Sequence, residues 1–180
     1  QVDVGGRDNK IFTTDEHVRE TSIEKLNQLR PAFKSDGSVT AGNASGINDG
    51  AAAVVVTTEQ NAVALHTETY FKLTSRAVCG VDHSIMGTGP IPAVRQALSQ
   101  AGLTIDDIDV IELNEAFAAI ALACASDLKI DLKKMNPNGG AIAIGHPLGM
   151  TGSRILQTAM LELHKQNKKY ALVTMCIGVG

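Results

Sequence analysis

Apolar and polar positions are distributed differently on the two sides of residue 40. Residues 1–39 are rich in charge, contain the Arg30-Pro31 break and show one helical pattern only, over residues 22–29. From residue 40 onward, runs of small and β-branched residues alternate with longer amphipathic stretches. We therefore expect residues 1–39 to be the tail of a loop excursion and residues 40–180 to form the main domain.

The main region alternates between strand-like and helix-like patterns. Short apolar runs bounded by turn residues predict strands at residues 51–57, 73–79, 109–113 and 170–175. Helical periodicity, alanine content and Pro or Gly boundaries predict helices at residues 59–66, 90–100, 114–128 and 151–165. Strands that alternate with helices form parallel sheets with the helices on their faces. The sequence therefore predicts an α/β fold.

Composition supports a globular core and excludes several functional classes. Hydrophobic residues make up 44% of the chain and aromatic residues 3%, which is typical of an Ala/Val/Ile-rich α/β core. The formal net charge is −3 and the basic residues are scattered, so we expect neither a nucleic-acid nor a membrane partner. The cysteines Cys79, Cys124 and Cys176 form no Cys-x-x-Cys pair. We therefore expect neither a disulfide framework nor a zinc site, and we expect the protein to function in a reducing compartment.

Two candidate reactive groups lie in glycine-rich turns near the end of the chain. His146 stands between Gly145 and Pro147, and Cys176 precedes Gly178. A nearby imidazole or helix N-terminus lowers the pKa of a thiol from its usual value of about 8.5, and a glycine amide can approach a developing oxyanion. The alternatives are a buried, inert cysteine and a histidine in a surface turn.

Two further polar positions follow from the element pattern. Asn114 lies where a predicted strand passes into a helix, at the edge of a parallel sheet where ligands bind, although asparagine is also a common helix N-cap. Ser45 lies in the polar, glycine-containing stretch from Gly42 to Gly50, which also offers several backbone N–H groups. Neither position identifies a reaction by itself.

Five stretches of the chain together resemble the thiolase family. They follow one another in the family's order over almost the whole chain: residues 40–53, 86–90, 114–118, 139–149 and 176–180. Within the first of them, Ala44-Ser45-Gly46-Ile47-Asn48-Asp49 is similar to the acetyl-CoA acetyltransferase branch of the family.

The resemblance implies both a fold and a reaction. The implied fold is a thiolase-like layered α/β fold, whose C-terminal half holds a mixed, mostly parallel sheet covered by helices. The implied reaction is acyl transfer, in which two acetyl-CoA molecules condense to acetoacetyl-CoA or the reverse thiolysis takes place. Coenzyme A thioesters are then the substrates, and the resemblance implies no metal and no further cofactor.

The resemblance also implies roles for individual residues. His146 would activate the nucleophilic cysteine, and Cys176 would move the α-proton of the second thioester. Asn114 would hold a water that, together with His146, stabilises the enolate, and the amide of Gly178 would belong to a second oxyanion hole. The acyl and pantetheine pocket would be lined by Ser45, Phe33, Met86 and Phe117.

The chain departs from the family pattern in what it lacks. No residue matches the family's nucleophilic cysteine, and the family's last strand has no counterpart before Gly180. The chain also begins with Gln1 and not with Met, so we expect a fragment whose N-terminal thiolase half is missing and which is inactive alone. The full-length protein is expected to be a homo-oligomer, dimer or tetramer. Cytoplasm or mitochondrion is the expected compartment, with the peroxisome as the alternative.

Three alternatives to the acetyl-CoA acetyltransferase interpretation stay open. A 3-ketoacyl-CoA thiolase of fatty-acid β-oxidation would carry the same groups and act on longer chains. A non-catalytic, thiolase-like module would bind CoA or a lipid, or associate with full-length subunits through an uncovered apolar face. The sequence could also simply be an incomplete record of a longer enzyme.

Overall fold

The computed structural model describes residues 2–3, 11–67 and 69–178. Its centre is a parallel pair of short strands, β3 (Val110–Leu113) and β4 (Ala171–Thr174). Their register runs from Val110 opposite Ala171 to Leu113 opposite Thr174. The parallel pairing predicted from strand and helix alternation is therefore confirmed.

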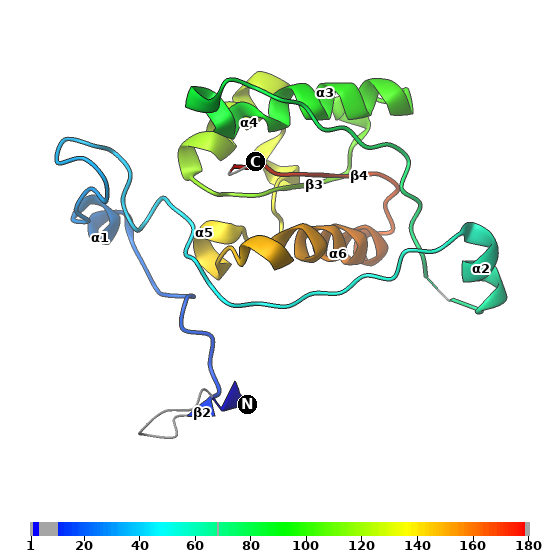
Figure 1. The fold of residues 1–180 in the computed structure, drawn as a ribbon, viewed down its shortest axis with the longest axis horizontal. Helices are drawn as coiled ribbons and strands as arrows, with labels where there is room; N and C mark the ends of the chain where they lie inside the picture. The colour runs from blue at the N-terminus through cyan, green and yellow to red at the C-terminus, as the bar shows by residue number, and fades with distance from the viewer. Residues whose placement is uncertain (1, 4–10, 68, 179–180) are drawn as a thin grey trace.

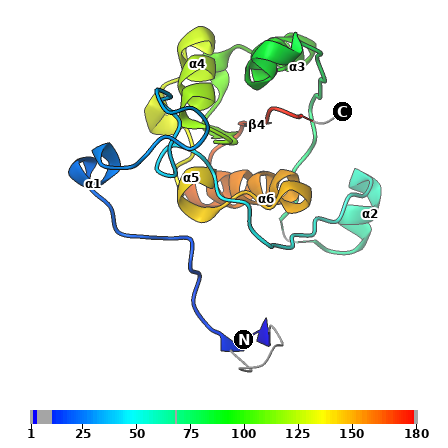
Figure 2. The ribbon, with the colours of Figure 1, turned by 60° about the vertical axis from the view of Figure 1, so that its left-hand side comes forward.

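Helices cover both faces of this strand pair, which gives three layers (Figures 1 and 2). On one face lie α3 (Pro90–Ala101) and α4 (Ala118–Leu128). On the other lie the short α5 (Ala141–Ile144) and the long α6 (Leu148–Gln166). The expected α/β class, with a sheet covered by helices, is confirmed.

The main hydrophobic core lies between the strands and the first of these helix layers. Ile111 and Leu113 of β3 are buried against Val94 of α3 and Cys124 and Ala125 of α4. Because side chains alternate along a strand, the intervening Glu112 of β3 points toward the α6 face. The strand pair is thus apolar on one face and carries a buried carboxyl on the other.

Two predicted strands are wrong. Residues 51–57 and 73–79 have no strand assignment, and Val55 and Val56 are 92% and 88% exposed. A run of β-branched residues forms a strand only where a neighbouring strand completes its hydrogen bonds, and no described segment pairs with either run. Residues 73–79 instead lie along α3, where Ser75 Oγ donates to the Ala97 carbonyl.

The predicted helices are confirmed, with shifted ends. α1 (Ile23–Asn27) and α2 (Glu59–Ala64) are short, and α6 begins at Leu148, ahead of the predicted start. α4 begins only at Ala118, because the preceding residues stay extended and Phe117 forms a bridge with Ala44. The elements that were not predicted are α5, the 3-10 turns η1 (His83–Thr88), η2 (Ile105–Asp107) and η3 (Leu132–Lys134), and the antiparallel pair β1 (Val2–Asp3) and β2 (Ile11–Phe12).

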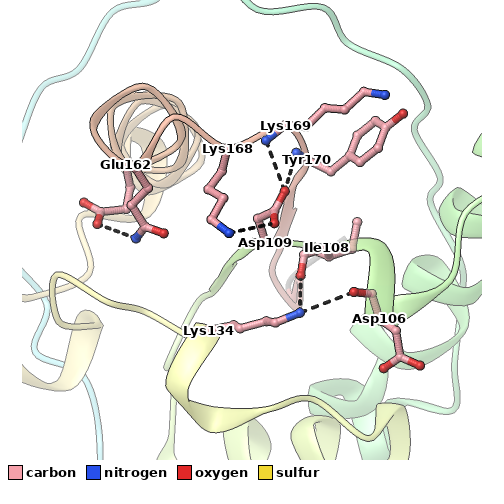
Figure 3. Close-up of polar contacts among 9 residues, drawn as sticks. Asp106, Ile108, Asp109, Lys134, Glu162, Lys168, Lys169 and Tyr170 are labelled. Carbon is pink, nitrogen blue, oxygen red and sulfur yellow. Dashed lines mark hydrogen bonds and ion pairs between the residues drawn. The ribbon is translucent and has the colours of Figure 1, made fainter.

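Polar contacts fix the amino ends of the two central strands (Figure 3). The Asp109 carboxylate accepts hydrogen bonds from the backbone N–H groups of Lys169 and Tyr170, each at 3.1 Å, and pairs with Lys168 Nζ at 3.8 Å. Beside it, Lys134 Nζ donates to the Ile108 carbonyl at 2.7 Å. The backbone hydrogen bond from Tyr170 is the main cause that holds the pKa of Asp109 below its usual value. These contacts set the register of β3 against β4.

We expect Asp109→Asn to lower the free energy of unfolding at pH 7 by about 1–3 kcal/mol, because hydrogen bonds to a charged acceptor are replaced by neutral ones. Urea unfolding of both proteins at pH 7 and pH 3 measures the difference. A lowered carboxyl pKa stabilises the fold above the unfolded-state pKa, and that stability is lost as pH falls through the folded-state pKa. The difference should therefore shrink at pH 3. Asp36→Asn, at an exposed site, is the control, and equal midpoints at pH 7 would contradict the assignment.

Candidate active site

Asn114 and Cys176 lie at the same edge of the strand pair. Asn114 directly follows β3, and its N–H donates to the Thr174 carbonyl of β4 at 3.0 Å. Cys176 follows shortly after Thr174, the last residue of β4. Both residues are buried. Because parallel strands end together, two residues far apart in sequence reach one carboxyl edge, where open α/β sheets bind ligands.

His146 reaches this edge through a tight turn between α5 and α6. Gly145 has φ +93°, a conformation that favours glycine, and a Cβ there would overlap the Asn48 side chain. The N–H of His146 then donates to the Gly46 carbonyl at 2.9 Å. The turn therefore holds the imidazole, which is 8% exposed, in one place.

A continuous chain of hydrogen bonds joins Asn114, His146 and Thr151. Asn114 Nδ2 lies 3.2 Å from His146 Nε2, and His146 Nδ1 lies 2.7 Å from Thr151 Oγ1. Thr151 is fully buried, and its hydroxyl donates to the Pro147 carbonyl at 2.9 Å. Since a hydroxyl has one proton, Thr151 must accept from Nδ1–H if every contact is a hydrogen bond. This assigns the Nδ1–H tautomer and leaves the Nε2 lone pair facing the Asn114 amide.

The environment keeps both reactive groups neutral at pH 7. Burial lowers the pKa of His146 below its usual value, and the Arg154 charge lowers it further. Burial raises the pKa of the Cys176 thiol. The site therefore presents a neutral imidazole, able to accept a proton at Nε2, and an undissociated thiol.

The oxygen of the Asn114 side chain is buried and has no hydrogen-bond partner among the described residues. An amide oxygen can accept two hydrogen bonds, and leaving it bare in a buried place costs free energy. A donor such as a water molecule at this point would remove that cost. The resemblance predicts a water held by Asn114, and the bare oxygen is compatible with it.

The loop that carries Ser45 is fastened to the segment that carries Asn114. Ser45 donates both its N–H and its hydroxyl to the Ala116 carbonyl, at 3.0 and 3.2 Å. Ala118 N–H donates to the Asn43 carbonyl at 2.8 Å. The Ser45 hydroxyl thus points to the backbone beside the site, and its lone pairs stay available to a ligand.

Of the other predicted site residues, some lie close to one another and one lies apart. A Cβ at Gly178 would overlap the Met86 side chain, so these two residues lie side by side in the region that follows β4. Phe117 is half-buried at the start of α4, beside the Ser45 loop. Phe33 is 77% exposed. The structure therefore joins His146 to Asn114 and Met86 to Gly178, and leaves Phe33 apart.

The thiols of the other two cysteines contact groups other than His146. Cys124 is buried inside α4 with its Sγ 3.7 Å from the Gly87 carbonyl, and burial raises its pKa to about 11. Cys79 lies beside α3, with its Sγ 3.0 Å from Gln96 Oε1. Across the described part of the chain, no group of three His, Cys, Asp or Glu side chains converges as metal ligands.

Sequence reasoning missed Thr151. Thr151 lies one helical turn into α6, five residues after His146, and a hydroxyl at that spacing was the available signal. It also missed His17, which is half-buried with Nε2 3.1 Å from the Ile142 carbonyl of α5.

Beneath the site, Glu112 is a buried carboxyl without a full set of partners. It is 1% exposed, and its Oε1 has no hydrogen-bond partner among the described residues. Burial raises its pKa to about 7, the nearby carboxylates of Glu115 and Glu162 raise it as well, and the Arg154 charge opposes the shift. Glu112 is therefore largely protonated in the folded chain at mildly acidic pH.

Comparison with known proteins decides the family. The family model for the thiolase C-terminal domain matches residues 67–180, and the model for the thiolase N-terminal domain matches residues 2–60. The chain belongs to the thiolase family. No helix within the described residues of this thiolase-family chain is both long enough and apolar enough to cross a membrane.

The family's relatives are longer than this chain. The acetyl-CoA acetyltransferase of Syntrophomonas wolfei is 55% identical over 178 residues, which cover 98% of this chain and 45% of that protein. The crystal structure of the Bacillus anthracis acetyl-CoA acetyltransferase matches with a TM-score of 0.91 and 42% identity, over 98% of this chain and 45% of that one. The crystal structure of human mitochondrial 3-ketoacyl-CoA thiolase in complex with CoA matches with a TM-score of 0.80 and 42% identity, over 94% of this chain and 43% of that one. The chain thus spans less than half the length of these relatives.

We expect Thr151→Val to change the protonation of the His146 ring. Without the hydroxyl, Nδ1–H is buried with no acceptor, so the ring shifts toward the Nε2–H tautomer and its pKa falls further. The free energy of unfolding should drop by about 1–3 kcal/mol. Nitrogen chemical shifts of the ring, followed across pH by NMR, measure tautomer and pKa together. Thr151→Ser keeps the hydroxyl and should keep the wild-type tautomer; an unchanged tautomer in the Val variant would refute the assignment.

We expect Glu112→Gln to remove part of the pH dependence of stability. Between pH 4.5 and about 7 the folded chain holds a proton on Glu112 that the unfolded chain releases, so this group weakens the fold as pH rises. Above pH 7, the ionised Glu112 should lower the free energy of unfolding of the wild type by about 3 kcal/mol. Urea unfolding between pH 4.5 and pH 8 should therefore show the variant gaining stability relative to wild type as pH rises. Glu20→Gln, at an exposed site, is the control, and parallel curves for wild type and Glu112→Gln would count against the shift.

Proposed function

We propose that this chain supplies the acid–base half of a thiolase active site that condenses two acetyl-CoA molecules to acetoacetyl-CoA, or cleaves acetoacetyl-CoA in reverse. The observation that supports the proposal is the buried chain from Asn114 through His146 to Thr151, at the edge where Cys176 also lies. A neutral imidazole with one fixed tautomer and a thiol within the same edge are the groups that such chemistry needs.

In the first half-reaction, His146 Nε2 takes the proton of a nucleophilic cysteine. The thiolate attacks the carbonyl carbon of one acyl-CoA and the C–S bond to CoA breaks. The departing CoA thiolate takes the proton of the Cys176 thiol, which leaves Cys176 as the thiolate. The lowered pKa of His146 supports this role, because at pH 7 the ring is neutral and Nε2 carries the lone pair that faces the Asn114 amide. Thr151 holds the ring so that this lone pair faces the edge of the sheet.

In the second half-reaction, Cys176 as thiolate takes the α-proton of the second acetyl-CoA. The resulting enolate carbon attacks the acyl-enzyme carbonyl, the C–S bond to the nucleophilic cysteine breaks, and the released cysteine thiolate takes its proton back from His146. Asn114, through a water, and His146 stabilise the enolate oxygen, and the amide of Gly178 stabilises the oxygen of the tetrahedral species. The bare Asn114 oxygen supports this role, since it can accept the proton of such a water.

The substrates that we propose are short coenzyme A thioesters, with Ser45, Met86 and Phe117 beside the acyl and pantetheine groups. Phe33 joins them only if its exposed loop is covered in the complete enzyme. The human 3-ketoacyl-CoA thiolase is as identical to this chain as the Bacillus anthracis acetyltransferase is, at 42% each, and its structure holds CoA. A 3-ketoacyl-CoA thiolase acting on longer chains is therefore the second candidate.

We further propose that the nucleophile lies outside this sequence. Cys176 has the base role, while the Sγ atoms of Cys79 and Cys124 contact Gln96 and the Gly87 carbonyl and not His146. The chain alone should then not turn over, because the covalent intermediate has no site at which to form.

A domain replacement tests the function. We expect no acetoacetyl-CoA thiolysis from the chain alone, and activity from a fusion in which it replaces the matching 178-residue stretch of the Syntrophomonas wolfei acetyltransferase. In that fusion, His146→Ala should lower kcat by about 10³-fold, because both proton transfer and enolate stabilisation are lost. Cys79→Ser is the matched control and should keep the parent rate.

Two outcomes would contradict the proposal: a folded fusion without activity, or a His146→Ala fusion as active as its parent. Thiolysis of 3-ketoacyl-CoA substrates of increasing chain length by the same fusion distinguishes the two candidates. Highest kcat/KM with acetoacetyl-CoA supports the acetyltransferase, and highest kcat/KM with longer chains supports the second candidate.

A further inference from the structure

The two polar groups that meet at the site come from segments with no shared backbone ladder. Asn114 ends β3, whereas His146 follows α5, and their side chains meet at 3.2 Å. Because no backbone ladder joins the two segments, other contacts must hold α5 against the end of β3. The side chains of Glu115 and Asn136 lie at this junction.

Asn136 makes the hydrogen bonds to the end of β3 that a neighbouring strand would otherwise make. Its Oδ1 accepts from Leu113 N–H at 2.9 Å, and its Nδ2 donates to the Leu113 carbonyl at 2.9 Å. Its own N–H donates to the Ile111 carbonyl at 2.7 Å. One side-chain amide thus satisfies both backbone groups of Leu113 at the residue directly before Asn114.

Glu115 links that amide to the start of α5. Glu115 Oε1 accepts from Asn136 Nδ2 at 3.1 Å, and Oε2 accepts from Ile142 N–H at 3.2 Å. α5 has no side-chain cap of its own, because its N-cap residue is Gly140. A Cβ at Gly140 would overlap the Glu115 carboxylate, so the glycine makes this close approach possible. The carboxylate therefore caps α5 from outside the helix.

These contacts connect the two halves of the site through one side chain. Glu115 is the neighbour of Asn114 in the chain, and the helix that it caps leads directly to His146. Both carboxylate oxygens are engaged on the side of Asn136 and Ile142, so Glu115 does not itself face the imidazole.

We propose that Glu115, held by Asn136, is a positioning residue that sets the separation between the Asn114 amide and the His146 ring. The proposal rests on the function proposed above for that pair. It assigns to Glu115 no proton transfer, only the placement of α5. Because a misplacement of about 1 Å can cost about 10²-fold in rate, a loosened α5 should act mainly on kcat.

The test uses Glu115→Ala, Glu115→Gln and the exposed control Glu20→Gln. In the active fusion, Glu115→Ala should lower kcat at least about 10-fold while KM for CoA stays within about twofold. Glu115→Gln should lower kcat by less, because the amide oxygen of the glutamine can still accept a hydrogen bond from Ile142 N–H. The control should match the parent.

A second readout needs no activity. In the chain itself, NMR titration of His146 should give a higher pKa in Glu115→Ala than in wild type, because a loosened α5 admits water to a ring whose pKa burial lowers. Arg154 also acts on this ring and stays unchanged in both proteins. If the parent fusion is inactive, the proposed function fails and this titration still decides the positioning role.

The positioning role is overturned if Glu115→Ala shows the wild-type kcat and the wild-type His146 titration, even with a lower Tm, because that result describes a stability effect alone. If Glu115→Ala does not fold, Glu115→Gln decides by the same two readouts. A changed His146 titration in the Glu20→Gln control would likewise count against a specific link.

Discussion

The parallel ladder between β3 and β4 is the constraint on which the rest of the site depends. It pairs Leu113 with Thr174, so the residues that follow each strand emerge at one edge. Asn114 and Cys176 are far apart in sequence, yet each follows the carboxyl end of one of these two paired strands. The contacts of Asp109 lie at the opposite end of the same ladder (Figure 3). A register slip of one residue would move each side chain to the other face of the sheet.

Around this ladder, hydrogen bonds between loops hold the functional segments in place. The Ser45 loop binds the Ala116 carbonyl, the His146 N–H binds the Gly46 carbonyl, and Glu115 caps α5. Such contacts need glycine at the closest approaches, as at Gly140 and Gly145. Each loop is therefore placed by its neighbours, and a change in one is transmitted to the others.

The site also contains polar groups that are costly to bury. Oε1 of Glu112, the side-chain oxygen of Asn114 and Nε of Arg154 are buried without hydrogen-bond partners among the described residues. Most of a folded chain satisfies such groups, and exceptions concentrate where a protein binds or reacts. Two of these residues act on His146, because the Asn114 amide contacts its Nε2 and the Arg154 charge lowers its pKa.

The sequence by itself determined the alternation of helices and central strands, the edge at which Asn114 and Cys176 lie, and the family. These follow from local periodicity and from motifs that are contiguous in the chain. Only the tertiary structure decided that residues 51–57 and 73–79 form no strand, because strand formation depends on a partner that local pattern does not reveal. It also decided the tautomer of His146 and the bridge from Glu115 to α5. Those depend on contacts between residues distant in sequence, or on which of two acceptors one hydroxyl proton reaches.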